Sequence, residues 1–350
     1  MEETLPAVGP ITIDAIEAAR ERIAGTILRT PLVKLQGYDD PEIYLKLENL
    51  QPINSFKLRG AANAVAMLPP ERRKLGVWTI SAGNAGQGVA YAARQAGVPC
   101  TVVTIETAPE TKVGRMRALG ATIVKASFDQ CWEAMERRTF PGIESTFVHP
   151  FDDDDFIAGN ATMGLEIFED LPEVETVITA MGGGGLVTGV ASGLRARKPR
   201  VRVLCAEPET AAPASISFQT GTASAFPQWR ATFVDGAGGK SVFPRMWERM
   251  RHVVDGSVVV ALDETKNAMR VLAEKPRVIA EGAGALSVAA ALSGRAGPGP
   301  IVAVISGGNI DLSMFCDLVG ACGGSTSDPS EEGSVNLKGA PGPHTRKRRS

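Results

Sequence analysis

Four consecutive glycines, Gly182 to Gly185, stand between an apolar segment, TVITAM, and the segment LVTGVASGLRAR. The pattern predicts a buried strand at 176–181 and a helix that begins near Leu186. Residues without side chains let backbone N–H groups approach an anion, and a helix N-terminus adds its positive dipole end. The turn therefore predicts a phosphate site, with close packing as the alternative. It lacks the lysine of a nucleotide P-loop and the spacing of a dinucleotide fingerprint.

Lys57 lies in NSFKLRG, residues 54–60, shortly after a predicted strand at 43–48. Ser55 is expected to cap a helix that Pro69 and Pro70 end, which places Lys57 in the first helical turn. Taken alone, such a lysine is typical of a surface charge. A partly desolvated amine instead has a lowered pKa, can form a Schiff base with an aldehyde and can later act as a base.

Two further polar turns follow predicted strands. SAGNAGQG, residues 81–88, opens a predicted helix and carries Ser81, Asn84 and Gln87 as its polar side chains. Its backbone N–H groups, hydroxyl and amides suit a carboxylate, and a simple capping turn explains the same residues equally well. The segment SGGN, 306–309, presents the neutral hydroxyl of Ser306 at the end of a predicted strand.

The elements that must position these residues alternate regularly between strand and helix. The first series is strand 76–81, helix 85–96, strand 99–105, helix 110–119, strand 121–126 and helix 128–138. The second series is helix 156–169, strand 176–181, a helix to Lys198, strand 201–206, helices near 263–274 and 282–292, strand 301–306 and a helix from Asp311. Such alternation predicts the α/β class, with mainly parallel sheets flanked by helices.

The two series predict two lobes in one chain, as expected for 350 residues. We expect a large domain formed by 1–68 plus 150–320 and a small domain formed by 69–149. The remaining segment, 321–350, is rich in glycine, serine, proline and charged residues, and we expect it to be disordered. Its RKRR run at 346–349 is more typical of a solvated terminal charge than of a nucleic-acid patch.

Composition and charge exclude several classes of function. Hydrophobic residues make up 44% of the chain and charged residues 22%, values typical of a soluble globular protein. The formal net charge of −2 gives no global attraction for nucleic acid. No run of about 18 apolar residues predicts a membrane span, and the N-terminus lacks a signal-peptide pattern. We therefore expect a cytoplasmic protein that binds neither nucleic acid nor membrane.

Cysteine and histidine usage argues against two common kinds of catalytic centre. The five cysteines have no paired spacing, and the three histidines, His149, His252 and His344, are isolated in the sequence. A zinc site or a Ser-His-Asp triad is therefore not expected.

Four motifs occur in one order along the chain: SFKLRGA, SAGNAGQG, the four glycines after a strand, and SGGN. This order resembles fold-type II pyridoxal-phosphate enzymes, and the chain is similar to the threonine/serine dehydratase and serine racemase family. The resemblance extends over residues 10 to 320 and includes LKLENLQP, AEPE and EGAGA. It implies a tryptophan synthase β-like fold with two open twisted sheets, pyridoxal 5'-phosphate (PLP) as cofactor, a small amino acid as substrate, and a homodimer.

The resemblance also implies a role for each motif. Lys57 would form the Schiff base with PLP, and Phe56 would pack beside the cofactor ring. Gly182 to Gly185 would hold the phosphate, Asn84 would meet the ring hydroxyl, and Ser306 would meet the pyridine nitrogen. The substrate site would be formed by residues of the 81–87 turn: Ser81, Ala82, Gly83, Ala85 and Gln87.

The implied reaction is elimination from a β-hydroxy amino acid such as L-threonine or L-serine. Released Lys57 would remove the α-proton, the hydroxyl would leave, and hydrolysis would give a 2-oxo acid and ammonia. A neutral Ser306 hydroxyl does not stabilise a protonated pyridine nitrogen, which favours rapid elimination over a long-lived carbanion. The alternatives are an amino-acid racemase or β-replacing synthase on the same scaffold, and a non-catalytic phosphate-binding module.

Several positions depart from the family pattern. Ala82 stands where racemase-type members carry a serine that acts as acid and base, which favours elimination over racemisation. Ala85 replaces a common histidine, and Asn160-Ala161 replaces a common Gln-Gly pair, so the side-chain specificity stays open. Some relatives bind a divalent cation, and the first ligand of that site is a glutamate that matches Glu207. Here Pro213 occupies the position of the later acidic ligand, so no metal site is expected.

Overall fold

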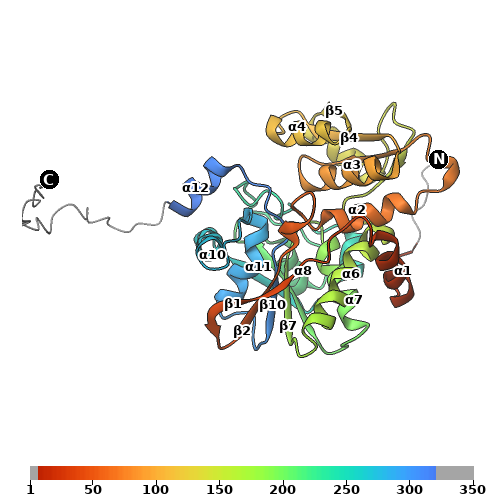
Figure 1. Ribbon diagram of the computed structural model, residues 1–350. Coiled ribbons are helices and arrows are strands. Elements are labelled where there is room, and N and C mark those ends of the chain that lie inside the picture. The colour runs from red at the N-terminus through yellow and green to blue at the C-terminus, as the bar shows by residue number, and fades with distance from the viewer. Residues whose placement is uncertain (1–6, 321–350) are drawn as a thin grey trace, which may run out of the picture.

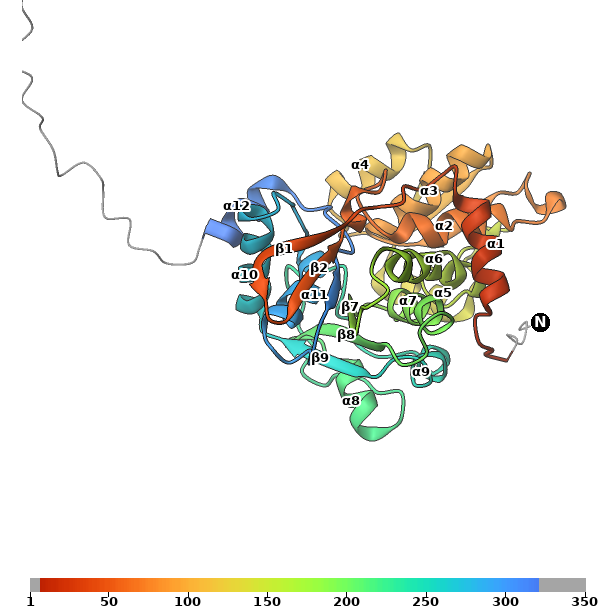
Figure 2. The same cartoon turned by 60° about the horizontal axis from the view of Figure 1, so that its bottom comes forward.

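The computed structural model describes residues 7–320 of the chain (Figures 1 and 2). This part of the chain forms two separate sheets, each flanked by helices. The helix α2, Lys57–Ala66, runs between the two lobes in Figure 1 and packs against helices of both. The predicted α/β class with two mainly parallel sheets is confirmed. The tail predicted to be disordered, 321–350, lies outside the described residues.

The larger sheet has six strands in the order β1-β2-β10-β7-β8-β9. The strands are β1 (Leu32–Asp39), β2 (Glu42–Lys46), β7 (Thr176–Ala180), β8 (Arg202–Pro208), β9 (Gly256–Val260) and β10 (Ile301–Val304). All neighbours run parallel except β1 and β2, which pair antiparallel at one edge. The parallel strands place the glycine run after β7 and Ser306 after β10 at the same edge of the sheet.

The smaller sheet has four parallel strands in the order β5-β4-β3-β6. They are β3 (Val77–Ile80), β4 (Cys100–Ile105), β5 (Thr122–Ala126) and β6 (Thr146–Phe147). All four lie within 69–149, the range predicted for the small domain, while the domain boundaries themselves stay a prediction. Both faces of a parallel sheet are covered, which explains why β3 is buried along its whole length.

Twelve α-helices and two 3₁₀ turns complete the described residues. Those that bear on the small sheet are α3 (Asn84–Ala96), α4 (Glu110–Ala118) and α5 (Phe128–Arg137). Those of the larger lobe are α1 (Ile13–Ile23), α6 (Asp154–Asp170), α7 (Gly185–Arg195), α8 (Pro213–Thr220), α9 (Pro244–Met250), α10 (Leu262–Glu274), α11 (Gly282–Leu292) and α12 (Leu312–Gly320). The 3₁₀ turns are η1 (Glu48–Leu50) and η2 (Pro70–Arg72). No helix among the described residues is both long and apolar enough to cross a membrane.

Glycines allow α3 and α6 to approach the first turn of α2 closely. A Cβ atom at Gly88 of α3 would lie 3.1 Å from the carbonyl oxygen of Lys57. A Cβ atom at Gly159 of α6 would overlap the carbonyl oxygen of Arg59. Because interiors are close-packed, larger side chains at these two positions would push the helices apart. The glycines therefore fix the position of the turn that carries Lys57.

The differences from the predicted elements are local. The sequence pattern does not predict β9, α8 or α9, although α8 and α9 each begin at a proline, which is favoured in the first helical turn. The predicted N-cap of α2, Ser55, lies one residue too early, because Phe56 occupies that position. The Ser55 hydroxyl nevertheless accepts a hydrogen bond from the Lys57 backbone N–H at 3.4 Å. This bond partly satisfies the Lys57 N–H, which has no acceptor within the helix because it lies in the first turn.

Candidate active site

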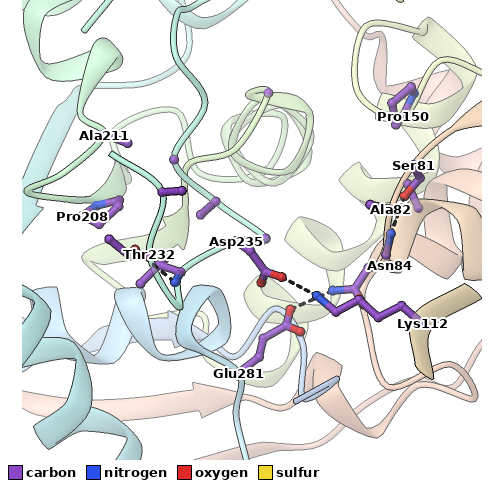
Figure 3. Close-up of a pocket in the computed structure, with 18 of the residues that line it drawn as sticks. Ser81, Ala82, Asn84, Lys112, Pro150, Pro208, Ala211, Thr232, Asp235 and Glu281 are labelled. Atoms are coloured by element: carbon purple, nitrogen blue, oxygen red, sulfur yellow. Dashed lines mark hydrogen bonds and ion pairs between the residues drawn. The ribbon is translucent and has the colours of Figure 1, made fainter. Parts of the chain in front are cut away.

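A pocket of about 590 Å³ lies between the two lobes and collects most of the residues predicted from the motifs. Predicted residues that line it are Phe56, Lys57, Ser81, Ala82, Gly83, Asn84, Ala85, Gly183 and Ser306. Figure 3 shows the Ser81–Asn84 turn on one side of this pocket and Pro208, Ala211 and Thr232 on the opposite side. A concave site of this size is typical of small-molecule pockets.

Lys57 enters the pocket from the first turn of α2. Its Nζ donates a hydrogen bond to the carbonyl oxygen of Pro150 at 2.6 Å and lies 5.2 Å and 5.4 Å from the ring centroids of Phe56 and Phe156. Burial lowers the pKa of Lys57 to about 8, because desolvation disfavours the charged amine. At neutral pH roughly a tenth of such an amine is uncharged and able to act as a nucleophile or a base.

The glycine run connects β7 to α7 and leaves no space for side chains. A Cβ atom at Gly183 would overlap the ring of Phe151, and one at Gly185 would lie 2.8 Å from the Phe151 carbonyl oxygen. Gly184 has φ +91°, a left-handed conformation that favours glycine, and it precedes the first residue of α7. No side chain caps this helix, so its first N–H groups remain available to an anion.

The turn at 81–84 brings a second helix N-terminus to the pocket. The Ser81 hydroxyl accepts a hydrogen bond from the Gly83 N–H at 3.0 Å, and α3 begins at Asn84 without a side-chain cap. Ala82 and Ala85, whose side chains are single methyl groups, line the same pocket. The turn therefore offers backbone donors and small side chains, which leaves room for a carboxylate.

Asn84 is held by two partners from the C-terminal part of the chain. Its Nδ2 donates to Glu281 Oε1 at 2.7 Å, and its Oδ1 accepts from Asn309 Nδ2 at 2.8 Å. Burial and, to a smaller extent, the negative charge of Asp235 raise the pKa of Glu281 to about 7, although the hydrogen bond from Asn84 opposes the shift. Near neutral pH this carboxyl group in the pocket wall is therefore partly protonated.

Ser306 ties the end of β10 to the start of α2. Its carbonyl oxygen accepts from the Phe56 N–H at 3.0 Å and from the Ser55 hydroxyl at 3.3 Å, while its side chain lines the pocket. Two segments that are 250 positions apart in the sequence thus present Lys57 and Ser306 to one cavity.

The mouth of the pocket is crossed by contacts between the lobes. Lys112 of α4 forms an ion pair with Asp235, which lies in the segment between α8 and α9 (Figure 3). Lys240 lies 4.5 Å from the ring centroid of Phe128 and 4.7 Å from that of Trp229. Trp229 and Asp235 line the pocket, so these contacts join this part of its wall to the lobe of the small sheet.

The structure does not bring every predicted residue to the pocket surface. Gln87 is buried one helical turn into α3, and its Nε2 has no hydrogen-bond partner among the described residues. Gly182, Gly184 and Gly185 lie beside the cavity rather than among the residues that line it. The site roles expected from the motifs also leave out Pro150, Phe151, Lys112 and Glu281, which line the pocket.

Glu207 does not have the surroundings of a metal ligand. Its two oxygens accept hydrogen bonds from the N–H groups of Ala214 and Ser215 at 2.8 Å and from the Ser257 hydroxyl at 2.6 Å. These contacts tie the end of β8 to the N-terminus of α8. Within residues 7–320, no cluster of three or more histidine, cysteine or acidic side chains is arranged to hold a metal ion.

Comparison with known proteins identifies the family. Residues 23–307 match the model of the pyridoxal-phosphate dependent enzyme family. The chain belongs to this family, and its fold is that of the fold-type II PLP enzymes.

Individual relatives cover most of the chain. It is 41% identical to the L-threonine ammonia-lyase of Thermotoga maritima over 315 residues, which span 88% of this chain and 78% of that protein. It is 36% identical to the catabolic L-threonine dehydratase of Staphylococcus aureus over 90% of this chain and 94% of that protein. The structure of maize serine racemase superimposes with a TM-score of 0.81 at 33% identity, covering 87% of this chain and 95% of that chain.

The residues of the pocket fit PLP. Lys57 supplies an amine whose pKa is lowered by burial. The 182–185 turn supplies a helix N-terminus where the space a side chain would need at Gly183 is taken by Phe151. An aldehyde and a phosphate on one small molecule match these two features.

Proposed function

We propose that this enzyme dehydrates and deaminates a small β-hydroxy amino acid, such as L-threonine or L-serine, to a 2-oxo acid and ammonia. The observation that carries the proposal is the meeting of Lys57, the 81–84 turn and the glycine run at one pocket. Two relatives at 41% and 36% identity, named as L-threonine ammonia-lyase and dehydratase, support it.

The residues that would hold PLP come from three segments. Lys57 would bind its aldehyde carbon, the backbone N–H groups of Gly182 to Gly185 would bind its phosphate, and Phe56 would pack beside its ring. Ser306 and Asn84 would meet the ring nitrogen and the ring hydroxyl. When bound, the cofactor supplies an aldehyde that condenses with amines and a ring that withdraws electrons from the α-carbon.

Lys57 would serve as the base that removes the α-proton once the substrate amine has displaced it. The pKa of about 8 leaves a useful fraction of neutral amine at neutral pH. The carbonyl oxygen of Pro150, 2.6 Å from Nζ, gives the amine a fixed direction and can also accept a hydrogen bond from its protonated form. The β-hydroxyl would then leave as water by taking up a proton, which the protonated amine of Lys57 can supply, and hydrolysis of the unsaturated product would release ammonia.

The N-terminus of α3 would bind the substrate carboxylate. Ser81, Ala82, Gly83 and Ala85 form the turn, and backbone N–H groups at a helix N-terminus attract a negative charge. Gln87 would act only indirectly, because it lies behind the turn. Binding the carboxylate here would orient the α-proton toward Lys57 and exclude water from that side of the pocket.

Ala82 favours elimination over racemisation. A racemase needs a proton donor on the face of the α-carbon opposite the lysine. The methyl group of Ala82 lines the pocket and has no proton to give.

The test is a product analysis of the purified protein and of Lys57→Ala. The wild type should change its visible PLP spectrum on addition of L-threonine or L-serine and release 2-oxo acid and ammonia in equal amounts. Lys57→Ala should lose at least about 10³-fold in rate and should yield no borohydride-stable PLP adduct at that position. Release of D-amino acid without 2-oxo acid by the wild type would overturn the elimination proposal. A lysine adduct at another residue would overturn the role of Lys57.

Two further expectations from the resemblance are proposals of the same kind. A homodimer would be detected by sedimentation or light scattering. A cytoplasmic location would be tested by fractionation of the source cells.

A further inference from the structure

The turn at 149–152 is held by the imidazole of His149, a side chain with no role in the proposed reaction. His149 Nδ1 accepts a hydrogen bond from the Asp152 backbone N–H at 2.9 Å and a second from the Phe151 backbone N–H at 3.3 Å. Both donors lie in a short connection between β6 and α6, where no regular secondary structure would otherwise satisfy them. One imidazole nitrogen therefore sets the shape of this turn.

The same turn contacts both halves of the proposed cofactor site. The carbonyl oxygen of Pro150 accepts the hydrogen bond from Lys57 Nζ at 2.6 Å. The ring of Phe151 fills the space that a side chain at Gly183 would need, and its backbone lies against Gly185. A shift of the turn would therefore move the acceptor of Lys57 and loosen the packing of the glycine run together.

The surroundings of His149 keep its ring neutral and fixed. The side chain is 1% exposed, and its ring centroid lies 5.5 Å from Phe147, 4.4 Å from Phe151 and 6.4 Å from Phe243. Burial lowers the pKa of His149 well below its usual value, and the positive charges of Arg138, Lys57 and Arg245 lower it further. A neutral imidazole that accepts at Nδ1 carries its proton on Nε2.

We propose that His149 is a positioning residue that holds the Pro150 carbonyl against Lys57 and the Phe151 ring against Gly183. It acts through the hydrogen bonds that its Nδ1 accepts from the backbone N–H groups of Phe151 and Asp152. This inference rests on the proposed cofactor roles of Lys57 and the glycine run. It adds a residue that follows the small sheet to a site whose other proposed parts are Lys57 and the turns at 81–84 and 182–185.

The test compares three variants of the purified holoenzyme. His149→Phe keeps a buried aromatic ring and removes the acceptor. His149→Asn places an amide oxygen near the position of Nδ1 and should restore the acceptor. Phe243→Leu disturbs the aromatic packing around His149 and Phe151, 6.4 Å and 5.3 Å away, but leaves the acceptor in place.

Hydrogen exchange gives the direct readout. In His149→Phe the amides of Phe151 and Asp152 should exchange roughly tenfold faster or more, because buried donors lose their acceptor. PLP should be released during dialysis faster by a similar factor, and kcat should fall more than KM rises. His149→Asn should recover most of the amide protection and of the PLP retention, and Phe243→Leu should change neither by more than about twofold.

Two outcomes would overturn the proposal. One is unchanged exchange and PLP release in His149→Phe. The other is equal loss in His149→Phe and Phe243→Leu without recovery in His149→Asn, which would show that the ring acts only through packing. Neither hydrogen exchange nor PLP release requires an amino-acid substrate, so failure of the proposed reaction is recognised separately by product analysis. Failure of the proposed role of Lys57 is recognised by borohydride reduction.

Discussion

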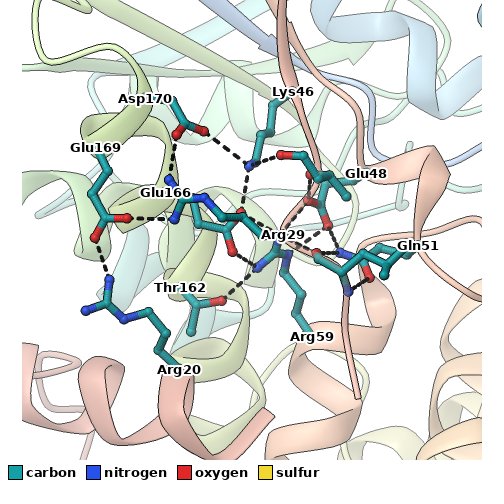
Figure 4. A network of polar contacts seen from close by, with 12 residues as sticks. Arg20, Arg29, Lys46, Glu48, Gln51, Arg59, Thr162, Glu166, Glu169 and Asp170 are labelled. Atoms are coloured by element: carbon teal, nitrogen blue, oxygen red, sulfur yellow. Dashed lines mark hydrogen bonds and ion pairs between the residues drawn. The ribbon is translucent and has the colours of Figure 1, made fainter. Parts of the chain in front are cut away.

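Lys57 and Arg59 lie two positions apart on α2, and their side chains enter opposite environments. Lys57 Nζ meets a backbone carbonyl in the pocket, at 2.6 Å. Arg59 is fully buried on the other side of the helix, where its guanidinium lies between Glu48 at 2.8 Å and Glu166 at 2.7 Å (Figure 4). The same helical turn therefore carries a reactive amine on one side and a charge-paired anchor on the other.

The anchor is balanced in charge. Lys46 Nζ donates to Glu166 Oε2 at 2.6 Å and to the Thr30 carbonyl oxygen at 2.7 Å, so two cations face the carboxylates of Glu48 and Glu166 (Figure 4). Two paired carboxylates next to two cations leave little net field at the neighbouring pocket. The low pKa of Lys57 is accordingly caused by burial.

Arg59→Met should destabilise the protein by about 3–5 kcal/mol, because two carboxylates would remain buried with one cation. Urea unfolding followed by circular dichroism measures the free energy of unfolding. The double variant Arg59→Met with Glu48→Gln restores the charge balance and should recover part of the loss. A loss below about 1 kcal/mol in the single variant would contradict the balanced-network explanation.

Glu281→Gln should change the pH dependence of stability. The pKa of Glu281 is raised to about 7 in the folded protein, against 4.5 for an ordinary glutamate. Between these two values the folded state retains the proton that the unfolded state has lost, so stability falls as pH rises through this window. A glutamine can still accept from Asn84 and carries no charge. The variant should therefore be more stable than the wild type at pH 8, by up to about 3 kcal/mol, but not at pH 4.

The measurement for Glu281→Gln is thermal unfolding at both pH values. Glu207→Gln is a matched control, because burial also raises the pKa of Glu207 to about 7. However, both oxygens of Glu207 accept hydrogen bonds from backbone N–H groups, so a glutamine at this position would lose one of these bonds. This control should show a similar pH-dependent difference with a further loss added at both pH values, so it should be less stable than Glu281→Gln throughout. Parallel melting curves for Glu281→Gln and the wild type at every pH would disprove the assignment.

Ala82→Ser should introduce a measurable racemase activity. The new hydroxyl would line the pocket near the α-carbon and could return a proton to the face opposite Lys57. Chiral chromatography after incubation with L-serine measures D-serine directly. Ala85→Ser adds the same group elsewhere in the pocket and should form no D-serine. Equal amounts from both variants would mean that position 82 has no special relationship to the α-carbon.

Gly183→Ala should weaken PLP retention by about tenfold or more, because its methyl group would overlap the ring of Phe151. Loss of visible absorbance during dialysis measures retention. Gly114→Ala in α4 is the control, since a Cβ atom there meets no atom within 4 Å. The control should retain PLP like the wild type. Full retention by Gly183→Ala would argue against the glycine run as the phosphate site.

The sequence predicts the alternation of strands and helices well, because hydrophobic periodicity and glycine turns are local signals. It also predicts that Lys57, Ser81, Gly183 and Ser306 carry chemistry, and the structure places all four at one pocket. The order of the strands is not contained in the local pattern. β10 is the last strand among the described residues, yet it lies between β2 and β7.

Other features of the site could not be predicted because they depend on tertiary approach. Glu281 precedes α11 in an ordinary capping position and becomes part of the pocket only through Asn84. Pro150 contributes a carbonyl oxygen, which no side-chain pattern reveals. His149 looks isolated in the sequence because its partners are backbone N–H groups two and three residues away.

The central place of β10 bears on how the protein is made. A nascent chain that has reached residue 300 contains Lys57 and the glycine run, but its large sheet still has a gap between β2 and β7. The Phe56 N–H also lacks the Ser306 carbonyl at this stage. We therefore expect ribosome-bound chains to capture cofactor only after β10 has left the exit tunnel.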